Sequence, residues 1–117
     1  MTPCIMIESV VAEVLFMGTE AETSGLEAFN AVKDREGLND DDAAVARTTG
    51  ILIQLINDEM IEVWLGDPNS REPVCHPGDP ASSQTITPER LLTMDEPDGR
   101  MLVYATTEKG ESALRGT

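Results

Sequence analysis

The apolar residues near the start of the chain fall on one side of a helix. Between residues 2 and 18 they recur three or four positions apart, as in the buried stripe of an amphipathic helix: Ile7, Val10, Val11, Val14 and Leu15. Thr2 followed by Pro3 is a favourable opening, because a hydroxyl can cap the helix and proline suits its first turn. We expect Gly18 to end this helix.

A second helix is predicted by a local capping pattern. Ser24 with Glu27 three residues later matches a capping box, in which each residue's side chain satisfies the other's backbone N–H. We expect this helix to end at Gly37 and to bury Leu26, Phe29 and Val32.

The third predicted helix has the strongest pattern. Asn39 is expected as its N-cap, and an aspartate run follows in the first turn, where the positive end of the helix dipole favours negative charge: Asp40, Asp41 and Asp42. Its buried stripe is expected to comprise Val45, Thr48 or Thr49, Leu52, Leu55 and Ile56.

After the third predicted helix, the spacing of the apolar residues changes to the alternation that is typical of a strand. Residues 61, 63 and 65 are aliphatic and alternate with Glu62 and Trp64, which indicates a strand with one covered face. Residues 67–99 are rich in proline, glycine and serine and predict a long loop, interrupted by a short helix over residues 87–92. A second strand is expected at residues 100–105.

The chain closes with "VYATTEKGESAL", in which Thr107 is expected to cap a final helix containing Ala113 and Leu114. The whole order predicts one α+β domain over residues 1–117: a three-helix unit, a two-stranded antiparallel wing with a long wing loop at 67–99, and a short C-terminal helix.

Two stretches carry a resemblance to a known family. Leu52 to Leu65 and Met101 to Leu114, about a quarter of the chain, resemble MarR- and PadR-type winged helix-turn-helix regulators. The second stretch is also similar to the end of small acidic bacterial proteins. The resemblance implies a winged-helix fold and, in the regulators, a third helix that enters the DNA major groove. This chain departs from the regulators in its long wing loop and in the charge of that helix.

The balance of charge changes the expected partner. Acidic residues outnumber lysines and arginines 22 to 8, giving a formal net charge of -14. Affinity for duplex DNA comes largely from lysine and arginine placed against phosphates, so nucleic acid is disfavoured and a basic protein is favoured. Adaptation to a salty cytoplasm would produce the same surplus of acids without any partner.

The cysteines and the apolar runs bear on localisation. Cys4 and Cys75 can form at most one disulfide, and we interpret both as free thiols of a cytoplasmic protein. Glu8 and Glu13 interrupt the apolar N-terminal stretch and no positive charge precedes it, which does not match a signal peptide. No uninterrupted apolar run approaches the roughly 20 residues needed to cross a bilayer, so no membrane partner is expected.

Cys75 and His76 are adjacent, and thiolate with imidazole serves both cysteine nucleophiles and zinc sites. Adjacent residues of an extended segment point in different directions, which disfavours mutual activation. Zinc needs about four ligands, whereas Cys4 is distant and only Asp79 is a further candidate. We expect a loop thiol beside a solvated histidine, with no cofactor, metal or catalytic residue; metal binding and catalysis are the weaker alternatives.

Candidate contact residues for a partner lie on the third helix. Asp40, Asp41 and Asp42 lack the alternating ligands and glycine of a calcium loop, and their simplest role is helix capping; an acidic patch that faces a partner is the alternative. Arg47 lies where a winged helix presents its reading residues, but it is isolated. Its alternative role is an ion pair with an aspartate, with Thr48 and Thr49 on the core side.

Trp64 is the remaining candidate contact residue. It lies on the polar side of its strand, where either the wing loop covers the indole or a second chain or other partner contacts it.

These patterns favour a noncatalytic interaction protein whose negative surface binds a basic site on another protein, as an inhibitor, immunity factor or DNA mimic does. The alternative is a dimeric winged-helix transcriptional regulator whose specificity comes from Arg47, Arg71, Arg90 and Arg100. An enzyme is least favoured, because the spacing of residues offers no catalytic constellation.

Overall fold

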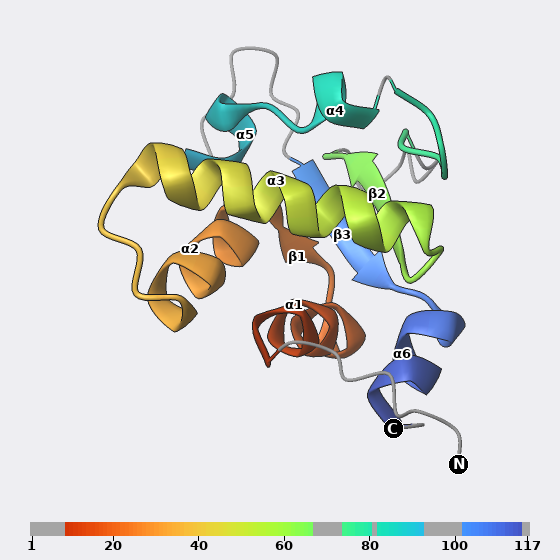
Figure 1. Ribbon diagram of the computed structural model, residues 1–117. Helices are drawn as coiled ribbons and strands as arrows, with labels where there is room; N and C mark the ends of the chain where they lie inside the picture. The colour runs from red at the N-terminus through yellow and green to blue at the C-terminus, as the bar shows by residue number, and fades with distance from the viewer. Residues whose placement is uncertain (1–8, 67–73, 81, 93–101, 116–117) are drawn as a thin grey trace.

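The computed structural model describes residues 9–66, 74–80, 82–92 and 102–115, with only the backbone at residues 83 and 89. Its elements, in chain order, are α1 (Ser9–Glu20), β1 (Thr23–Ser24), α2 (Gly25–Arg35), α3 (Asp41–Asn57), β2 (Ile61–Leu65), α4 (Ser82–Thr85), α5 (Pro88–Leu92), β3 (Leu102–Thr106) and α6 (Glu108–Arg115) (Figure 1). The fold is therefore α+β, as the sequence predicts.

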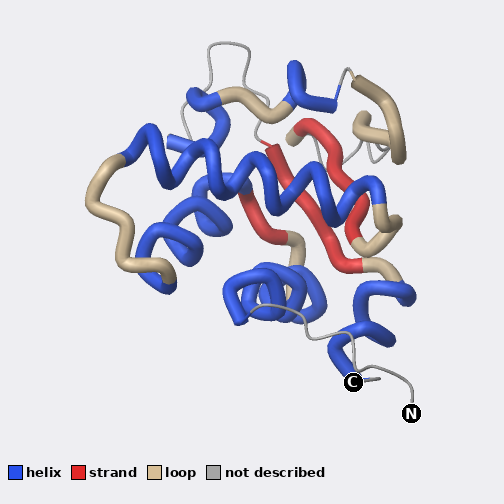
Figure 2. Tube along the Cα trace, in the orientation of Figure 1, coloured by secondary structure: helices blue, strands red, loops and turns tan. Residues whose placement is uncertain are grey.

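The strands form one antiparallel sheet in the order β1, β3, β2 (Figure 2). β2 and β3 pair along their full lengths, from Ile61 opposite Thr106 to Leu65 opposite Leu102. β1 adds to the other edge of β3 and is not predicted by the sequence pattern. A strand of two residues has no alternation by which it could be recognised.

Helix α1 continues past Gly18 to Glu20, so the expectation that this glycine ends the helix is wrong. The part of the predicted helix before Ser9, including Thr2 and Pro3, lies outside the described residues. Gly18 instead allows α1 to approach β3 closely. A Cβ at this position would lie 2.5 Å from Thr106 Oγ1 and 2.9 Å from the ring of Tyr104.

Two hydrogen bonds hold β3 against α1. The Tyr104 hydroxyl donates to the Val14 carbonyl at 2.7 Å, and Thr106 Oγ1 donates to the Leu15 carbonyl at 2.6 Å. Tyr104 is almost wholly buried, and a buried phenol needs such an acceptor to offset the loss of water. Burial also raises the pKa of Tyr104, so its hydroxyl stays protonated as a donor.

The beginning of α2 confirms the predicted capping box. Ser24 Oγ accepts the Glu27 N–H at 3.1 Å, and the Glu27 carboxylate accepts the Ser24 N–H at 2.9 Å. Gly37, expected as the terminator, follows the C-cap Glu36 and has a φ of 63°, a backbone conformation that favours glycine.

Helix α3 begins one residue later than expected. Asp40 is the N-cap instead of Asn39, and its Oδ1 accepts the Asp42 N–H at 3.0 Å. The predicted stripe is buried at Thr48, Leu52, Leu55 and Ile56, whereas Val45 is half-buried. Together with apolar residues of α1, α2 and the sheet, this stripe forms the core. None of the helices that the structure describes is long and apolar enough to cross a membrane.

The predicted wing loop is described only in part, and that part packs on the core. α5 matches the predicted short helix, whereas α4 is an additional helical turn that lies between Pro80 and Pro88. Both lie beside α3 in Figure 1. The buried residues of this segment include Cys75, Ile86 and Leu91. These side chains anchor the described part of the segment.

Thr107 caps α6, as predicted, and joins it to the turn between α3 and β2. Its hydroxyl accepts the Gly110 N–H at 3.2 Å and donates to the Glu59 carbonyl at 2.7 Å. A Cβ at Gly110 would lie 2.4 Å from the Met60 carbonyl oxygen, so glycine is needed for this approach. The "TTEKG" segment therefore forms a joint between α6 and the α3–β2 turn.

Candidate functional site

The aspartate run lies at the exposed N-terminus of α3. Asp40, Asp41 and Asp42 are all exposed, and Lys33 of α2 donates to Asp41 Oδ1 at 2.6 Å. The capping role expected for the run is confirmed at Asp40. The run also remains accessible to a partner, because its side chains project from the surface and Asp41 keeps 57% of its side chain exposed within its ion pair.

Arg47, the candidate reading residue, pairs with a glutamate. Its Nε donates to the carboxylate of Glu36, which follows α2, so this atom pairs with a glutamate where the sequence predicts an aspartate. Glu36 takes this role because the α2–α3 connection brings it beside the second turn of α3. Thr48 faces the core, as expected, and donates to the Ala44 carbonyl at 2.7 Å, while Thr49 is half-buried.

The structure thus brings the aspartates and Arg47 together at the N-terminal half of α3. There Lys33 of α2 pairs with Asp41, and Glu36 pairs with Arg47. Two of the other proposed specificity residues, Arg71 and Arg100, lie outside the described residues. Arg90 donates to the Thr85 carbonyl at 2.8 Å and so helps to hold the segment that carries α4 and α5.

Trp64 lies apart from these residues on β2. It is only 6% exposed, and its register partner on β3, Val103, is 7% exposed. The strand is therefore covered on both faces at this position, although its sequence pattern predicts only one covered face. Burial of this extent leaves almost none of the indole for a second chain to contact.

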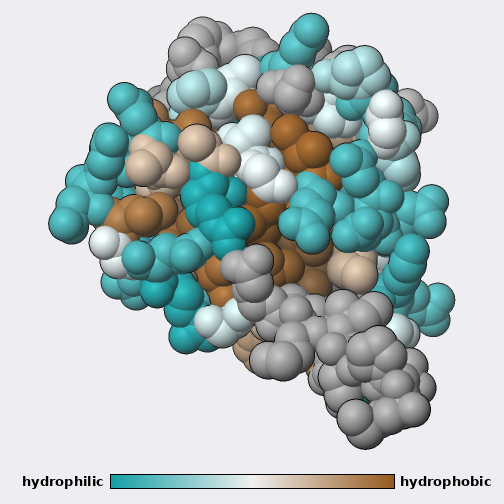
Figure 3. All heavy atoms as spheres, in the orientation of Figure 1, coloured by the Kyte–Doolittle hydropathy of each residue, from teal (hydrophilic) through white to brown (hydrophobic). Residues whose placement is uncertain are grey.

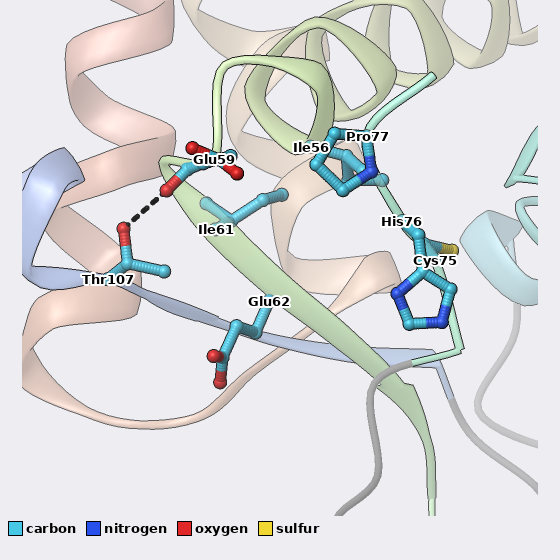
Figure 4. Close-up of a pocket in the computed structure, with 8 residues that line it drawn as sticks. All are labelled: Ile56, Glu59, Ile61, Glu62, Cys75, His76, Pro77 and Thr107. Atoms are coloured by element: carbon cyan, nitrogen blue, oxygen red, sulfur yellow. Dashed lines mark hydrogen bonds between the residues drawn. The ribbon is translucent and has the colours of Figure 1, made fainter. Parts of the chain in front are cut away.

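The thiol of Cys75 and the imidazole of His76 point in different directions, as expected (Figure 4). Cys75 is a free, buried thiol beside Ser82 and Thr85, whereas His76 is exposed. Burial raises the pKa of Cys75, and its hydrogen bonds with Ser82 and Thr85 offset that rise only in part. A thiol of this kind is protonated at neutral pH and is a poor nucleophile.

Val74, the first residue that the structure describes after Gly66, lies along the outer edge of β2. Its N–H donates to the Val63 carbonyl at 2.8 Å, and the Gly78 N–H donates to Asn57 Oδ1 at 2.8 Å at the end of α3. These two bonds fix the segment of Cys75, His76 and Pro77 in front of β2. Between this segment and the α3–β2 turn lies a hollow of about 240 Å³.

Figure 4 shows how this hollow is built. Ile56 and Ile61 form its apolar base, while Glu59, Glu62 and Thr107 lie on the side opposite His76 and Pro77. The sequence pattern identifies His76 alone of this polar set. Glu59, Glu62 and Thr107 were not identified as functional candidates, because three separate parts of the chain meet only in the folded molecule. The exposed carboxylates of Glu59 and Glu62 have no distinguishing signal in a chain so rich in acids, and Thr107 is predicted only as a helix cap.

The hollow is bordered by residue types that can bind metals, Glu59, Glu62, Cys75 and His76. Within the described part of the chain, no three histidine, cysteine, aspartate or glutamate side chains are arranged to hold a metal ion. Comparison of the chain with models of protein families, with curated proteins and with solved structures gives no match, so the chain's own residues have to carry the inference of its function.

Proposed function

We propose that this protein is a noncatalytic acidic interaction module with a winged-helix-like scaffold, and that its negative surface binds a basic site on a partner protein. Inhibition of that partner, as by an immunity factor or a DNA mimic, is the biological role that this chemistry would serve.

The observation that carries the proposal is the state of the cations on α2 and α3. Lys33 pairs with Asp41 at 2.6 Å, and Arg35 pairs with Glu13 at 3.2 Å. Arg47 pairs with Glu36. Every lysine and arginine of these two helices therefore faces a carboxylate, and would have to leave it before it could contact a phosphate.

A surplus of acids remains on the same surface. Asp34, Asp40 and Asp42 are exposed around the α2–α3 connection, where Figure 3 shows hydrophilic residues gathered at the left edge of the molecule. Single exposed ion pairs contribute little to stability, about 0 to 1 kcal/mol each. Their summed field matters more, because a concentrated negative surface speeds encounter with a basic partner.

The order of elements supports the winged-helix part of the proposal. Three helices, α1 to α3, precede the antiparallel pair β2 and β3, and the outer side of α3 is uncovered. Such a scaffold presents α3 to a macromolecule. With its cations already paired, that helix is better suited to a cationic surface than to DNA.

The test is binding of the partner at two salt concentrations. The full chain is immobilised, partners are captured from cell extract, and the association rate of each purified partner is measured at low and high salt. We expect a basic protein whose association slows markedly as salt rises. The Asp40→Asn/Asp42→Asn variant should slow association, since asparagine retains the cap and removes charge. Glu20→Gln/Glu108→Gln, which also removes two exposed acids but away from α3, is the matched control. Capture of nothing basic at either salt concentration would refute the proposal.

A dimeric transcriptional regulator is the second candidate, and one observation favours it. The outer side of α3 carries small or uncharged exposed residues at helical spacing, Ala43, Ala46, Gly50 and Gln54, which would allow close approach to a groove. A mobility-shift assay with the gene's upstream DNA at low salt distinguishes the regulator from the acidic interaction module. We expect no shift; a shift that Arg47→Ala abolishes would establish the regulator.

A further inference from the structure

We propose that the hollow beside β2 receives an arginine side chain of the basic partner, with its guanidinium between the carboxylates of Glu59 and Glu62. This inference rests on the proposed function and specifies where, and by what chemistry, the partner is held.

The size of the hollow selects the kind of occupant. Its volume of about 240 Å³ is below the roughly 300–1,000 Å³ of pockets that enclose small-molecule ligands or cofactors. A single long side chain is a better match. An arginine side chain has an aliphatic stem and a charged end. In the hollow, Ile61 and Pro77 can contact the stem, and the carboxylates can pair with the charged end.

Neither carboxylate has a close cationic partner among the residues that the structure describes. The side chain of Glu62 is exposed, and its carboxylate makes no hydrogen bond or ion pair with any residue that the structure describes. Among the described residues, the carboxylate of Glu59 has one ion-pair contact, a long one of 4.0 Å with Lys109, in which both side chains are more than half exposed. The glutamates on the other side of the molecule differ, because Glu13 and Glu36 are already paired with arginines.

The backbone at Glu59 is consistent with a role for this side chain. Glu59 has a φ of 62° at the turn after α3, where its N–H donates to the Ile56 carbonyl and the Met60 N–H donates to the Leu55 carbonyl. Glycine is the residue most at ease in this helix-ending conformation. The chain has a glutamate there, which places a carboxylate at the rim of the hollow.

Arginine fits this arrangement better than lysine. Its planar guanidinium has several N–H donors and can bridge two carboxylates, whereas the lysine ammonium is a compact and strongly hydrated charge. The guanidinium can also stack on an aromatic ring, and the exposed imidazole of His76 borders the hollow.

The experiment is an NMR titration of the full ¹⁵N-labelled chain at low salt. The probes are a blocked Gly-Gly-Arg-Gly-Gly peptide, the same peptide with lysine, and the same peptide with citrulline, the uncharged analogue of arginine. We expect the arginine peptide to shift the amides of residues 59–62, His76 and Thr107, with weaker binding of lysine and none of citrulline.

Two variants distinguish binding of the arginine peptide in the hollow from general attraction by the negative charge of the chain. Glu62→Gln keeps the size of an exposed side chain and should weaken binding of the arginine peptide roughly two- to fivefold, the range expected for one exposed ion pair. Glu20→Gln removes the same charge from the end of α1 and should leave this binding unchanged.

Three results would overturn the proposal. They are shifts confined to the N-terminus of α3, equal weakening by the two variants, or equal binding of the citrulline peptide. Each of these leaves the proposed acidic interaction function in place if a basic protein still binds with strong salt dependence. Failure of that function is distinct, since it requires that no basic protein is captured at either salt concentration.

Discussion

A glycine-to-alanine exchange should have opposite effects at two helical positions of this fold. In α6, a Cβ at Gly110 would lie 2.4 Å from the Met60 carbonyl oxygen and 2.6 Å from Thr106 Cγ2. In α3, a Cβ at Gly50 would have no neighbour within 4 Å. The two sites therefore separate the intrinsic helical preference of alanine from the space that the tertiary structure leaves for it.

The expected magnitudes follow from these contacts. Alanine is favoured over glycine inside a helix by up to about 1 kcal/mol, and this is the whole effect expected for Gly50→Ala. At Gly110 the gain is opposed by overpacking of about 1–3 kcal/mol. The Met60 carbonyl cannot easily move, because it accepts the Thr107 N–H at 2.9 Å. Loss of hydrogen bonds at this joint adds about 0.5–1.5 kcal/mol each, so we expect net destabilisation of about 1–3 kcal/mol.

Urea unfolding measures both effects. The single tryptophan, Trp64, is 6% exposed, so its fluorescence should report loss of the fold, and far-UV circular dichroism provides a second probe. We expect the urea concentration at the unfolding midpoint to fall for Gly110→Ala and to rise for Gly50→Ala. The dependence of the unfolding free energy on urea concentration should stay unchanged. An unfolding free energy of Gly110→Ala equal to or above that of the natural chain would refute the steric explanation.

The remaining predictions concern three buried or strained groups. Tyr104→Phe should lower the free energy of unfolding by about 1–2 kcal/mol in urea, because the buried bond to Val14 is lost. Burial raises the pKa of Tyr104, so the natural chain should lose stability as pH rises above about 10, where the tyrosine of the unfolded chain ionises. This loss should be smaller in Tyr104→Phe. An equal dependence of the unfolding free energy on pH in the two proteins would contradict the burial of an ionisable Tyr104. Glu59→Gly should raise the free energy of unfolding by about 1 kcal/mol in thermal denaturation, because φ is 62° there, and a decrease would show that the side chain stabilises the turn. In a Cys4→Ser background, alkylation of Cys75 by iodoacetamide at neutral pH should be slow until urea unfolds the chain, because the thiol is buried with a raised pKa; rapid labelling of the native protein would contradict this.

The features that the sequence predicts correctly are those that depend on neighbours a few residues away. The capping box of α2 joins Ser24 and Glu27, and the cap of α6 joins Thr107 and Gly110. The period of the aliphatic residues likewise locates α3 and β2. Such interactions form within one helical turn or along one strand, so the local order of residues is sufficient to predict them.

The sequence alone determined the class of fold, most of its helices and the surplus of negative charge. Only the tertiary structure decided that Gly18 and Gly110 are points of close contact, that Arg47 is paired with Glu36, and that Glu59 and Glu62 border a hollow. The physical reason is distance along the chain: the bond from Tyr104 to Val14 spans 90 positions, and the hollow joins three separate segments. No local pattern specifies which distant backbone will lie within a few ångströms of a given side chain.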